Sequence, residues 1–375
     1  MDIKNLKKIL LTLFFVLLAT SLSACSISTT SNGTNTSLGD GNLFFSSDRG
    51  NNWREVNNLP TINAKIEKIA EIEVESFFYD PSDSAAIYLA TRNHGLYFTY
   101  NIARGWNKAV GLPEAKINVV SVDPKDKCVI YAASANRLYR SNDCARSFSQ
   151  VYYDNSTDIS INTIVIDYYN PKNVYIATSR GEVIKSIDAG MSWRTIQRLE
   201  KGVARLVLSP LDSRLIFLAT EDNRVYSFFS NTNTDSANSA DLEANFLVDN
   251  FVDLNVVLKD FKLGDKFNDL LMTNDGTLFL ATGNMVLRSQ DSGITWEGLK
   301  LIQPDGEVEI SSLAVNPQNP QEIYYLTAAT FFRSTDGGAT WMTKKIPTGR
   351  LGSDILVDFK NSQNIYLGTV KPVRK

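Results

Sequence analysis

Three features of the 375-residue sequence predict an all-β fold: a seven-bladed β-propeller built from four-stranded antiparallel blades. An eight-residue box recurs along the chain, a short buried strand recurs between the boxes, and the two chain ends together supply one missing unit. A repeat of about 45 residues that holds four short strands is typical of sheets stacked radially around a channel. A six-bladed ring and an open solenoid are the alternatives.

The box has the pattern Ser-x-Asp-x-Gly-x-Thr-Trp. Five clear copies begin at Ser46, Ser141, Ser186, Ser289 and Ser334, and their aspartates are Asp48, Asp143, Asp188, Asp291 and Asp336. A degenerate copy begins at Thr99, and alignment of the preceding strands places an unrecognisable one near Phe228. We expect a structural role, in which Asp accepts backbone N–H groups two residues on, Gly supplies a positive φ, and Trp packs beneath. The box would then staple the turn between the third and fourth strands of each unit.

A run of β-branched and aromatic residues lies in every interval between boxes. These runs cover 87–91, 129–133, 174–178, 215–220, 278–282, 323–327 and 365–369. Each run is too short for a helix and too continuously apolar for a sheet that is wet on one face, so it predicts a buried strand. Turn signals such as Asp80-Pro81 stand ahead of most of them.

The chain ends predict how the ring closes. One strand, 43–47, precedes the first box, and two strands, 354–359 and 365–369, follow the last box. We therefore expect the N- and C-terminal strands to pair in one shared blade, which hides both sheet edges. The other six blades are expected near 70–108, 117–151, 161–198, 202–248, 267–299 and 309–346.

The first 41 residues predict export and a membrane anchor. Residues 1–24 combine three lysines with an apolar run that is shorter than a spanning helix needs, as in a signal peptide. The string Leu22-Ser23-Ala24-Cys25 resembles the bacterial lipobox, which implies cleavage before Cys25 and lipidation of that residue. An ordinary secretory signal is the alternative. Residues 25–41, after the cut, predict a flexible tether rich in Ser, Thr, Asn and Gly, and residues 42–375 remain for the propeller.

Composition and cysteine positions restrict the chemistry. The 38 Lys and Arg against 41 Asp and Glu give a net charge of −3, which argues against a nucleic-acid partner. One histidine excludes a multi-His zinc site, and the acidic loop at 154–158 lacks the Gly and Glu of a calcium loop, so we expect no metal and no cofactor. Cys128 and Cys144 flank a predicted hairpin with both thiols on one face, which leaves a disulfide and two free thiols as the alternatives.

The boxes resemble those of BNR or Asp-box propellers over residues 42–369. This set includes sialidases, xyloglucan-cleaving glycosidases, the sortilin ectodomain and the photosystem II assembly factors. Sialidases resemble the chain through the boxes alone, since their Arg-Ile-Pro element is not found, and xyloglucan-cleaving enzymes use two propellers. A single propeller behind a lipoprotein signal resembles the photosystem II assembly type more closely, and sortilin-type propellers more distantly.

The resemblance implies a monomeric, non-enzymatic scaffold that binds a protein or another ligand. It would be lipid-anchored in the cell membrane or outer membrane and face the periplasm or the exterior. An extracytoplasmic glycoside hydrolase, of sialidase or xyloglucanase type, is the alternative, because a catalytic carboxylate pair among 41 acidic residues leaves no sequence signature.

Arginines mark a candidate binding face. The predicted turns between second and third strands contain one arginine in each of four consecutive blades: Arg92, Arg137, Arg180 and Arg224. Such an arc suits the carboxylates of an acidic peptide, a protein C-terminus or an anionic glycan. The alternative is that polar turns are simply rich in arginine. The polar insert 230–241 with the apolar patch 246–251 after it predicts either a loose loop or a partner-docking arm.

Overall fold

The computed structural model describes residues 40–60, 67–69, 71–230, 246, 248–302 and 309–373. All of them belong to one compact unit, Leu38–Lys375, and the architecture below is that of this unit. The predicted signal peptide, Cys25 and the tether up to residue 39 lie outside the described residues. Within the described part of the chain, no helix is long and apolar enough to cross a membrane.

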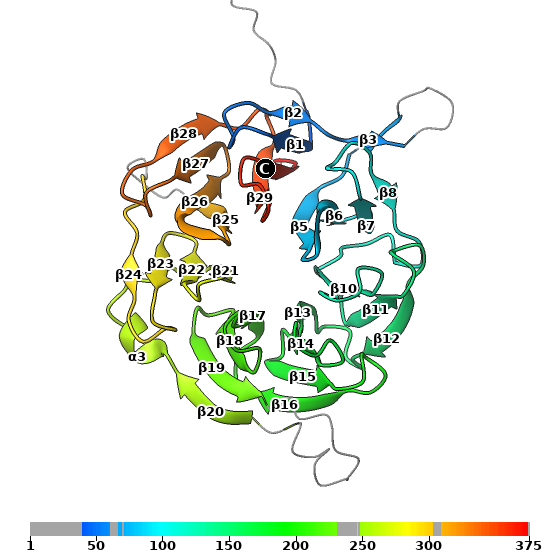
Figure 1. The fold of residues 1–375 in the computed structure, drawn as a ribbon, viewed down its shortest axis with the longest axis vertical. Coiled ribbons are helices and arrows are strands. Elements are labelled where there is room, and N and C mark those ends of the chain that lie inside the picture. Colours follow the sequence, from blue (N-terminus) through cyan, green and yellow to red (C-terminus); the bar gives the residue numbers. More distant parts are fainter. Residues whose placement is uncertain are drawn as a thin grey trace, which may run out of the picture. The chain divides into compact units, whose positions relative to one another are not determined.

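Seven four-stranded antiparallel sheets surround a central channel (Figure 1). The predicted all-β, seven-bladed propeller is therefore confirmed. Blade 1 contains β5 (Val74–Asp80), β6 (Asp83–Thr91), β7 (Leu96–Thr99) and β8 (Asn107–Lys108). Blade 2 contains β9 (Val119–Val122), β10 (Ile130–Ser134), β11 (Arg137–Ser141) and β12 (Ser149–Tyr153). Blade 3 contains β13 (Ile161–Ile166), β14 (Val174–Thr178), β15 (Glu182–Ser186) and β16 (Arg194–Arg198).

The remaining blades repeat this meander. Blade 4 contains β17 (Val203–Leu208), β18 (Leu215–Thr220), β19 (Val225–Ser230) and β20 (Val248–Asp253). Blade 5 contains β21 (Phe267–Met272), β22 (Leu278–Thr282), β23 (Val286–Ser289) and β24 (Glu297–Gly298). Blade 6 contains β25 (Ile310–Asn316), β26 (Asn319–Thr327), β27 (Thr330–Ser334) and β28 (Met342–Lys345). The inner strands, nearest the channel, include β5, β13, β17, β21 and β25 of these blades and β29 (Leu351–Val357) of the closing blade (Figure 1), and β9 also lines the channel.

The closing blade joins the two ends of the propeller, as predicted. Its strand order is β2 (Arg54–Glu55), β1 (Leu43–Ser46), β30 (Ile365–Val370) and β29 (Leu351–Val357). β1 pairs with β30 in an antiparallel register that runs from Leu43 opposite Gly368 to Ser46 opposite Ile365. The N-terminal strand thus covers the edge of β30, which would otherwise present unpaired backbone groups.

Apolar side chains of neighbouring sheets fill the space between blades. Tyr175, the second residue of β14, is fully buried in a cluster with Val203 and Leu206 of blade 4. The equivalent position of the second strand holds a fully buried tyrosine in five blades, namely Tyr88, Tyr131, Tyr175, Tyr324 and Tyr366. The second strands are therefore buried on both faces, which accounts for their continuously apolar sequences.

Three details differ from the expected blade boundaries. Blade 4 extends to Asp253, beyond the predicted residue 248, because its fourth strand follows the insert. Within that insert, residues 231–245 lie outside the described part of the chain. A two-stranded hairpin, β3 (Asn58–Leu59) with β4 (Glu67–Lys68), links the closing blade to blade 1, and a single helical turn, α3 (Asn255–Leu258), follows β20.

Candidate functional site

The five clear boxes lie on turns between third and fourth strands and share one hydrogen-bond pattern. In blade 3 the Ser186 hydroxyl donates to Asp188 Oδ1 (2.7 Å) and accepts the N–H of Gly190 (2.8 Å). Asp188 Oδ1 also accepts the N–H of Ser192 at 2.8 Å, four residues after the aspartate. The prediction that Asp accepts an N–H two residues on is wrong, because the serine hydroxyl occupies that place. The Trp193 indole donates to the Gly190 carbonyl (3.1 Å), as part of the same turn.

These hydrogen bonds give the box aspartates a structural role, because each carboxylate stabilises its own turn. The hydroxyl of Ser147 lowers the pKa of Asp143 to about 2, and that of Thr340 lowers the pKa of Asp336 to about 2. Both carboxylates are therefore ionised and hydrogen-bonded to their own turn at neutral pH. Phe228 pairs with Ile216 in the register in which Ser186 pairs with Val174, although β19 continues to Ser230 and residues 231–245 after it lie outside the described part of the chain.

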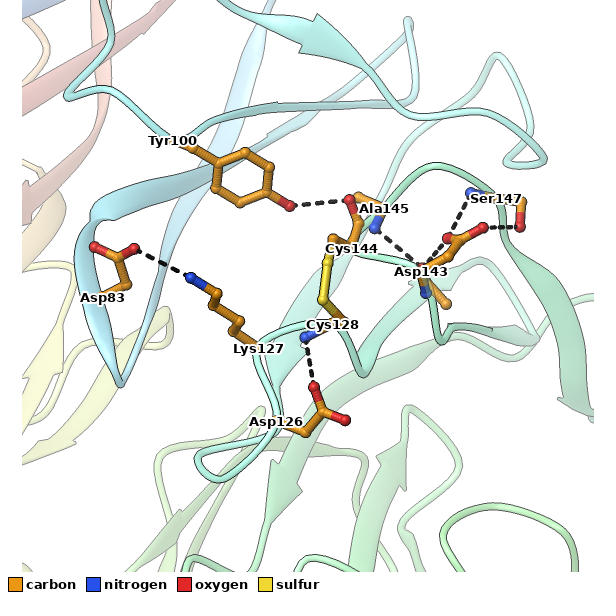
Figure 2. The surroundings of a disulfide bond; sticks show 10 residues. Asp83, Tyr100, Asp126, Lys127, Cys128, Asp143, Cys144, Ala145 and Ser147 are labelled. Atoms are coloured by element: carbon orange, nitrogen blue, oxygen red, sulfur yellow. Dashed lines mark hydrogen bonds and ion pairs between the residues drawn. A yellow bond between two sulfur atoms is a disulfide. The ribbon is translucent and has the colours of Figure 1, made fainter.

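A disulfide joins Cys144, in the box of blade 2, to Cys128, which lies just before β10 (Figure 2). This box has lost its glycine, because Ala145 occupies the position at a φ of 64°, and Cys144 has a φ of 59°. The Tyr100 hydroxyl of blade 1 donates to the Cys144 carbonyl at 2.9 Å. The disulfide therefore fastens a box that lacks the glycine to the segment just before β10.

The central channel has a polar funnel at the end where the second-to-third turns lie. Its lining includes Glu75, Lys116, Asn118, Asn162 and Asn268, and its cavity has a volume of about 510 Å³. Lys116 forms an ion pair with Glu75 at 2.8 Å. Each of the three asparagines donates to the backbone carbonyl of the inner strand in the next blade, as Asn162 does to Val203 (2.9 Å). The amides therefore connect blades and also present polar groups to the funnel.

The four predicted arginines lie at this end, with different partners. Arg92 donates through Nε to Glu75 (3.0 Å), and Arg224 lies 3.4 Å from Asp222. Arg137 is exposed and donates to the neutral Gln150 at 3.3 Å.

Arg180 is held by two buried carboxylates. It pairs with Asp154 at 2.7 Å and with Glu182 at 2.5 Å, and both acids have side-chain exposures below one tenth. Three of the four positive charges are thus partly neutralised within the chain. Among the described residues, Arg137 has no carboxylate partner, so it is the most available anchor of the arc.

The opposite half of the channel is an apolar funnel that the sequence did not predict. Its cavity of about 450 Å³ is lined by all seven inner strands, and its charged lining among the described residues consists of Arg205, Asp269 and Asp354. Arg205 Nε lies 3.1 Å from Asp269 Oδ1. Burial raises the pKa of Asp269, and the charge of Arg205 opposes that effect.

Asp354 is the most fully engaged acid of this funnel. Its Oδ2 accepts the Ser76 hydroxyl (2.9 Å) and the Phe77 N–H (2.8 Å), and its Oδ1 accepts the Ser312 hydroxyl (2.9 Å). Burial raises the pKa of Asp354 to about 6, and the negative charge of Asp269 adds to the effect, although the three hydrogen bonds favour the ionised form.

A shared backbone irregularity places these polar groups at one level of the channel. Six inner strands have a register shift near their start, and each shift is followed by a polar residue: Ser76, Thr163, Arg205, Asp269, Ser312 and Asp354. A bulge of this kind turns a side chain away from its regular alternation. We call these six residues the polar ring. An alignment of the first strands of the repeats would have shown that this position is polar in six of them.

Within the described ranges, no set of three or more His, Cys, Asp or Glu side chains is arranged to hold a metal ion.

Known proteins resemble this chain in fold but not in sequence. No family model matches the sequence, and no curated protein matches it. The GH74 xyloglucanase from Xanthomonas campestris superposes with a TM-score of 0.63 at 14% identity, over 80% of this chain and 51% of the enzyme. This chain therefore spans about half the length of that enzyme.

Two solved structures of YCF48 match over nearly their whole length. YCF48 bound to a D1 peptide has a TM-score of 0.56 at 16% identity, over 84% of this chain and 96% of YCF48. YCF48 from Cyanidioschyzon merolae has a TM-score of 0.56 at 10% identity, over 83% and 98%. At these identities the likeness shows the propeller fold alone.

Proposed function

We propose that this chain is a non-enzymatic scaffold that binds an acidic polypeptide, or another anionic ligand, on the face of the second-to-third turns. The observation that carries the proposal is the position of Arg92, Arg137, Arg180 and Arg224 on four consecutive blades at one end of the channel, beside the polar funnel. The fold likeness to YCF48, which has been solved with a peptide bound, supports a binding role. An assembly role of the photosystem II type is the narrower form of the same proposal.

The proposal includes a lipid anchor on Cys25 and a location outside the cytoplasm, in the cell membrane or outer membrane. The lipobox-like string before Cys25 supports the anchor. The Cys128–Cys144 disulfide supports the location, because disulfides persist in oxidising compartments.

Ligand binding requires the arc to exchange internal carboxylates for those of the ligand. Exposed ion pairs contribute little free energy, on the order of 0 to 1 kcal/mol each, so Arg92 and Arg224 exchange partners at low cost. A guanidinium carries five N–H donors, which lets an arginine keep one partner and add a second. We therefore expect Arg137 to contribute most to binding, and Arg180 to serve mainly to neutralise Asp154 and Glu182.

Fluorescence polarisation with two labelled peptides tests the proposal. An Asp- and Glu-rich decapeptide with a free C-terminal carboxylate should bind, and a neutral peptide of the same length should not. Arg137→Ala should weaken binding by roughly tenfold, as expected for loss of a charge-assisted hydrogen bond. The matched control is the pair Arg104→Ala and Arg146→Ala, which removes exposed arginines of the peripheral boxes. Equal affinity for the two peptides, or an equal effect of the control, would refute the arginine face.

A glycoside hydrolase is the second candidate function, and one observation favours it. Asp354 has a pKa raised to about 6 and lines a cavity together with a second carboxyl, Asp269, which is the combination a general acid and its partner need. The fold likeness to the GH74 xyloglucanase is compatible with it. Hydrolysis of xyloglucan or aryl glycosides that disappears in Asp354→Asn would establish the enzyme, and the absence of turnover in the wild type would reject it.

A further inference from the structure

The apolar funnel lies at the opposite end of the channel from the arginine face and has the properties of a small-molecule site. It begins at the level of Asp354 and opens between first-to-second turns that carry Pro81, Pro124 and Pro317. Its walls include Phe78 and Leu271. A cavity of about 450 Å³ with apolar walls and a few convergent polar groups falls within the range of drug-sized ligand sites, roughly 300 to 1,000 Å³.

The charge at the base of the funnel is negative. Arg205 lies 3.1 Å from Asp269, so that pair is close to neutral as a unit. Asp354 is different, because its three hydrogen-bond donors among the described residues are neutral: the Ser76 hydroxyl, the Phe77 N–H and the Ser312 hydroxyl. With Asp354 ionised, the three charged groups therefore sum to about −1, in a setting where apolar walls weaken screening by water.

We infer that the apolar funnel binds an amphipathic amine, whose ammonium group contacts Asp354 and whose alkyl or aryl body packs on the apolar walls. Asp354 is half-buried on an apolar wall, where a carboxylate without a countercharge is costly, so a cationic group gains from pairing there. The same carboxylate would repel an anion, and a neutral ligand would gain only the contacts with the apolar walls. The funnel thus selects by charge and uses the walls for affinity.

Binding of an amine competes with protonation of Asp354. The titratable and charged groups that line the funnel with this carboxyl are Asp269 and Arg205, with Tyr79 further along β5 and Tyr168 after β13. Burial raises the pKa of both tyrosines, so their hydroxyls stay neutral. Because the pKa of Asp354 is about 6, the acid is ionised at pH 8 and mostly protonated at pH 4.5. The preference for an amine over a neutral analogue should therefore be present at pH 8 and lost at pH 4.5.

Three probes of the same shape test the inference in calorimetric titrations of the full chain: phenethylamine, 2-phenylethanol and 3-phenylpropionate. At pH 8 the amine should bind at least about tenfold more tightly than the alcohol, the ratio expected of one charge-assisted hydrogen bond. The carboxylate probe should bind more weakly than the alcohol. At pH 4.5 the amine and the alcohol should bind within about twofold of each other.

A matched pair of variants separates the funnel from general surface charge. Asp354→Asn should reduce the amine preference to within about twofold at pH 8, whereas Asp249→Asn, which removes one exposed carboxylate of β20, should leave it unchanged. Equal binding of amine and alcohol at pH 8, no binding of either, or tightest binding of the carboxylate probe would each overturn the inference. Loss of the preference in Asp249→Asn would do the same. Peptide binding to the arginine face is measured separately, so failure of one result leaves the other standing.

Discussion

Replacement of Asp354 by Asn should stabilise the protein at alkaline pH and have little effect at acidic pH. The pKa of this carboxyl is about 6 in the folded chain, against its ordinary value of 3.8. The folded state therefore holds the proton more tightly than the unfolded state does. The stability contributed by this group is fully present below about pH 4 and is lost as the pH rises through 6. A shift of about two pKa units corresponds to about 3 kcal/mol at most.

The amide can keep two of the three hydrogen bonds around residue 354 and can reverse the third. Its oxygen can accept the Ser76 hydroxyl and the Phe77 N–H in place of Oδ2, and its NH₂ can donate to the Ser312 hydroxyl oxygen in place of Oδ1. The variant removes the charge, but the Ser312 hydroxyl loses Oδ1 as its acceptor, which offsets part of the gain. We therefore expect Asp354→Asn to be more stable than the wild type by up to about 3 kcal/mol at pH 8 and equal to it near pH 4.

Urea unfolding of both proteins at half-unit steps from pH 4 to pH 8 measures this difference, in which the contributions of titrating groups that do not interact with residue 354 cancel. Asp336→Asn is the opposite control, because hydrogen bonds lower the pKa of Asp336 to about 2. That group stabilises the fold above its ordinary pKa, and its contribution is lost as the pH falls towards 2, so its amide variant should be less stable at neutral pH. A pH-independent effect of Asp354→Asn, or destabilisation at pH 8, would refute the reasoning.

Three further substitutions test the turns and the closure. Replacing Cys128 and Cys144 by Ser should lower the free energy of unfolding by about 3 kcal/mol, the value expected for a loop closed by a disulfide over 16 residues, and chemical denaturation without reductant measures it. Ala145→Gly should increase the free energy of unfolding by about 0.5 to 1 kcal/mol and so raise the melting temperature, because residue 145 has a φ of 64°. A lower melting temperature would contradict the turn geometry. Gly368→Ala should destabilise the fold by about 1 to 3 kcal/mol, since its Cβ would lie 2.4 Å from Val74 Cγ1 across the seam between the closing blade and blade 1. A neutral outcome in thermal unfolding would argue against that close approach.

Much of the fold was predictable because its signals are local. Each box and each apolar strand is a run of five to eight residues, and the closing blade follows from what the two chain ends lack. The partners of the arginines were not predictable. Glu75 precedes Arg92 by 17 residues on another strand, and only the strand pairing of blade 1 brings them together. The ion pairs of Arg180 depend in the same way on Asp154 of the preceding blade.

The polar ring in the channel was missed for a different reason. Single residues such as Thr163 or Asp269 within an apolar strand resemble chance interruptions, and the alternation of side chains predicts no common direction for them. The register shift supplies that direction, and it is a property of strand pairing that one sequence does not display. The box bonds were partly misassigned because Ser and Asp compete for the same backbone donors in a short turn.

The polar ring also connects the blades that it lines. The Thr163 hydroxyl accepts the N–H of Leu206 in the next blade (3.2 Å), the Ser312 hydroxyl accepts that of Ile355 (3.2 Å), and Asp354 accepts that of Phe77 (2.8 Å). Asp354 thus lies at the seam where the closing blade meets blade 1, and it is the one of these three acceptors that carries charge. Its ionisation strengthens the bond to Phe77 and at the same time places a charge among apolar walls. The same carboxyl is therefore both a connection at the seam and the part of the channel that would gain most from a cation.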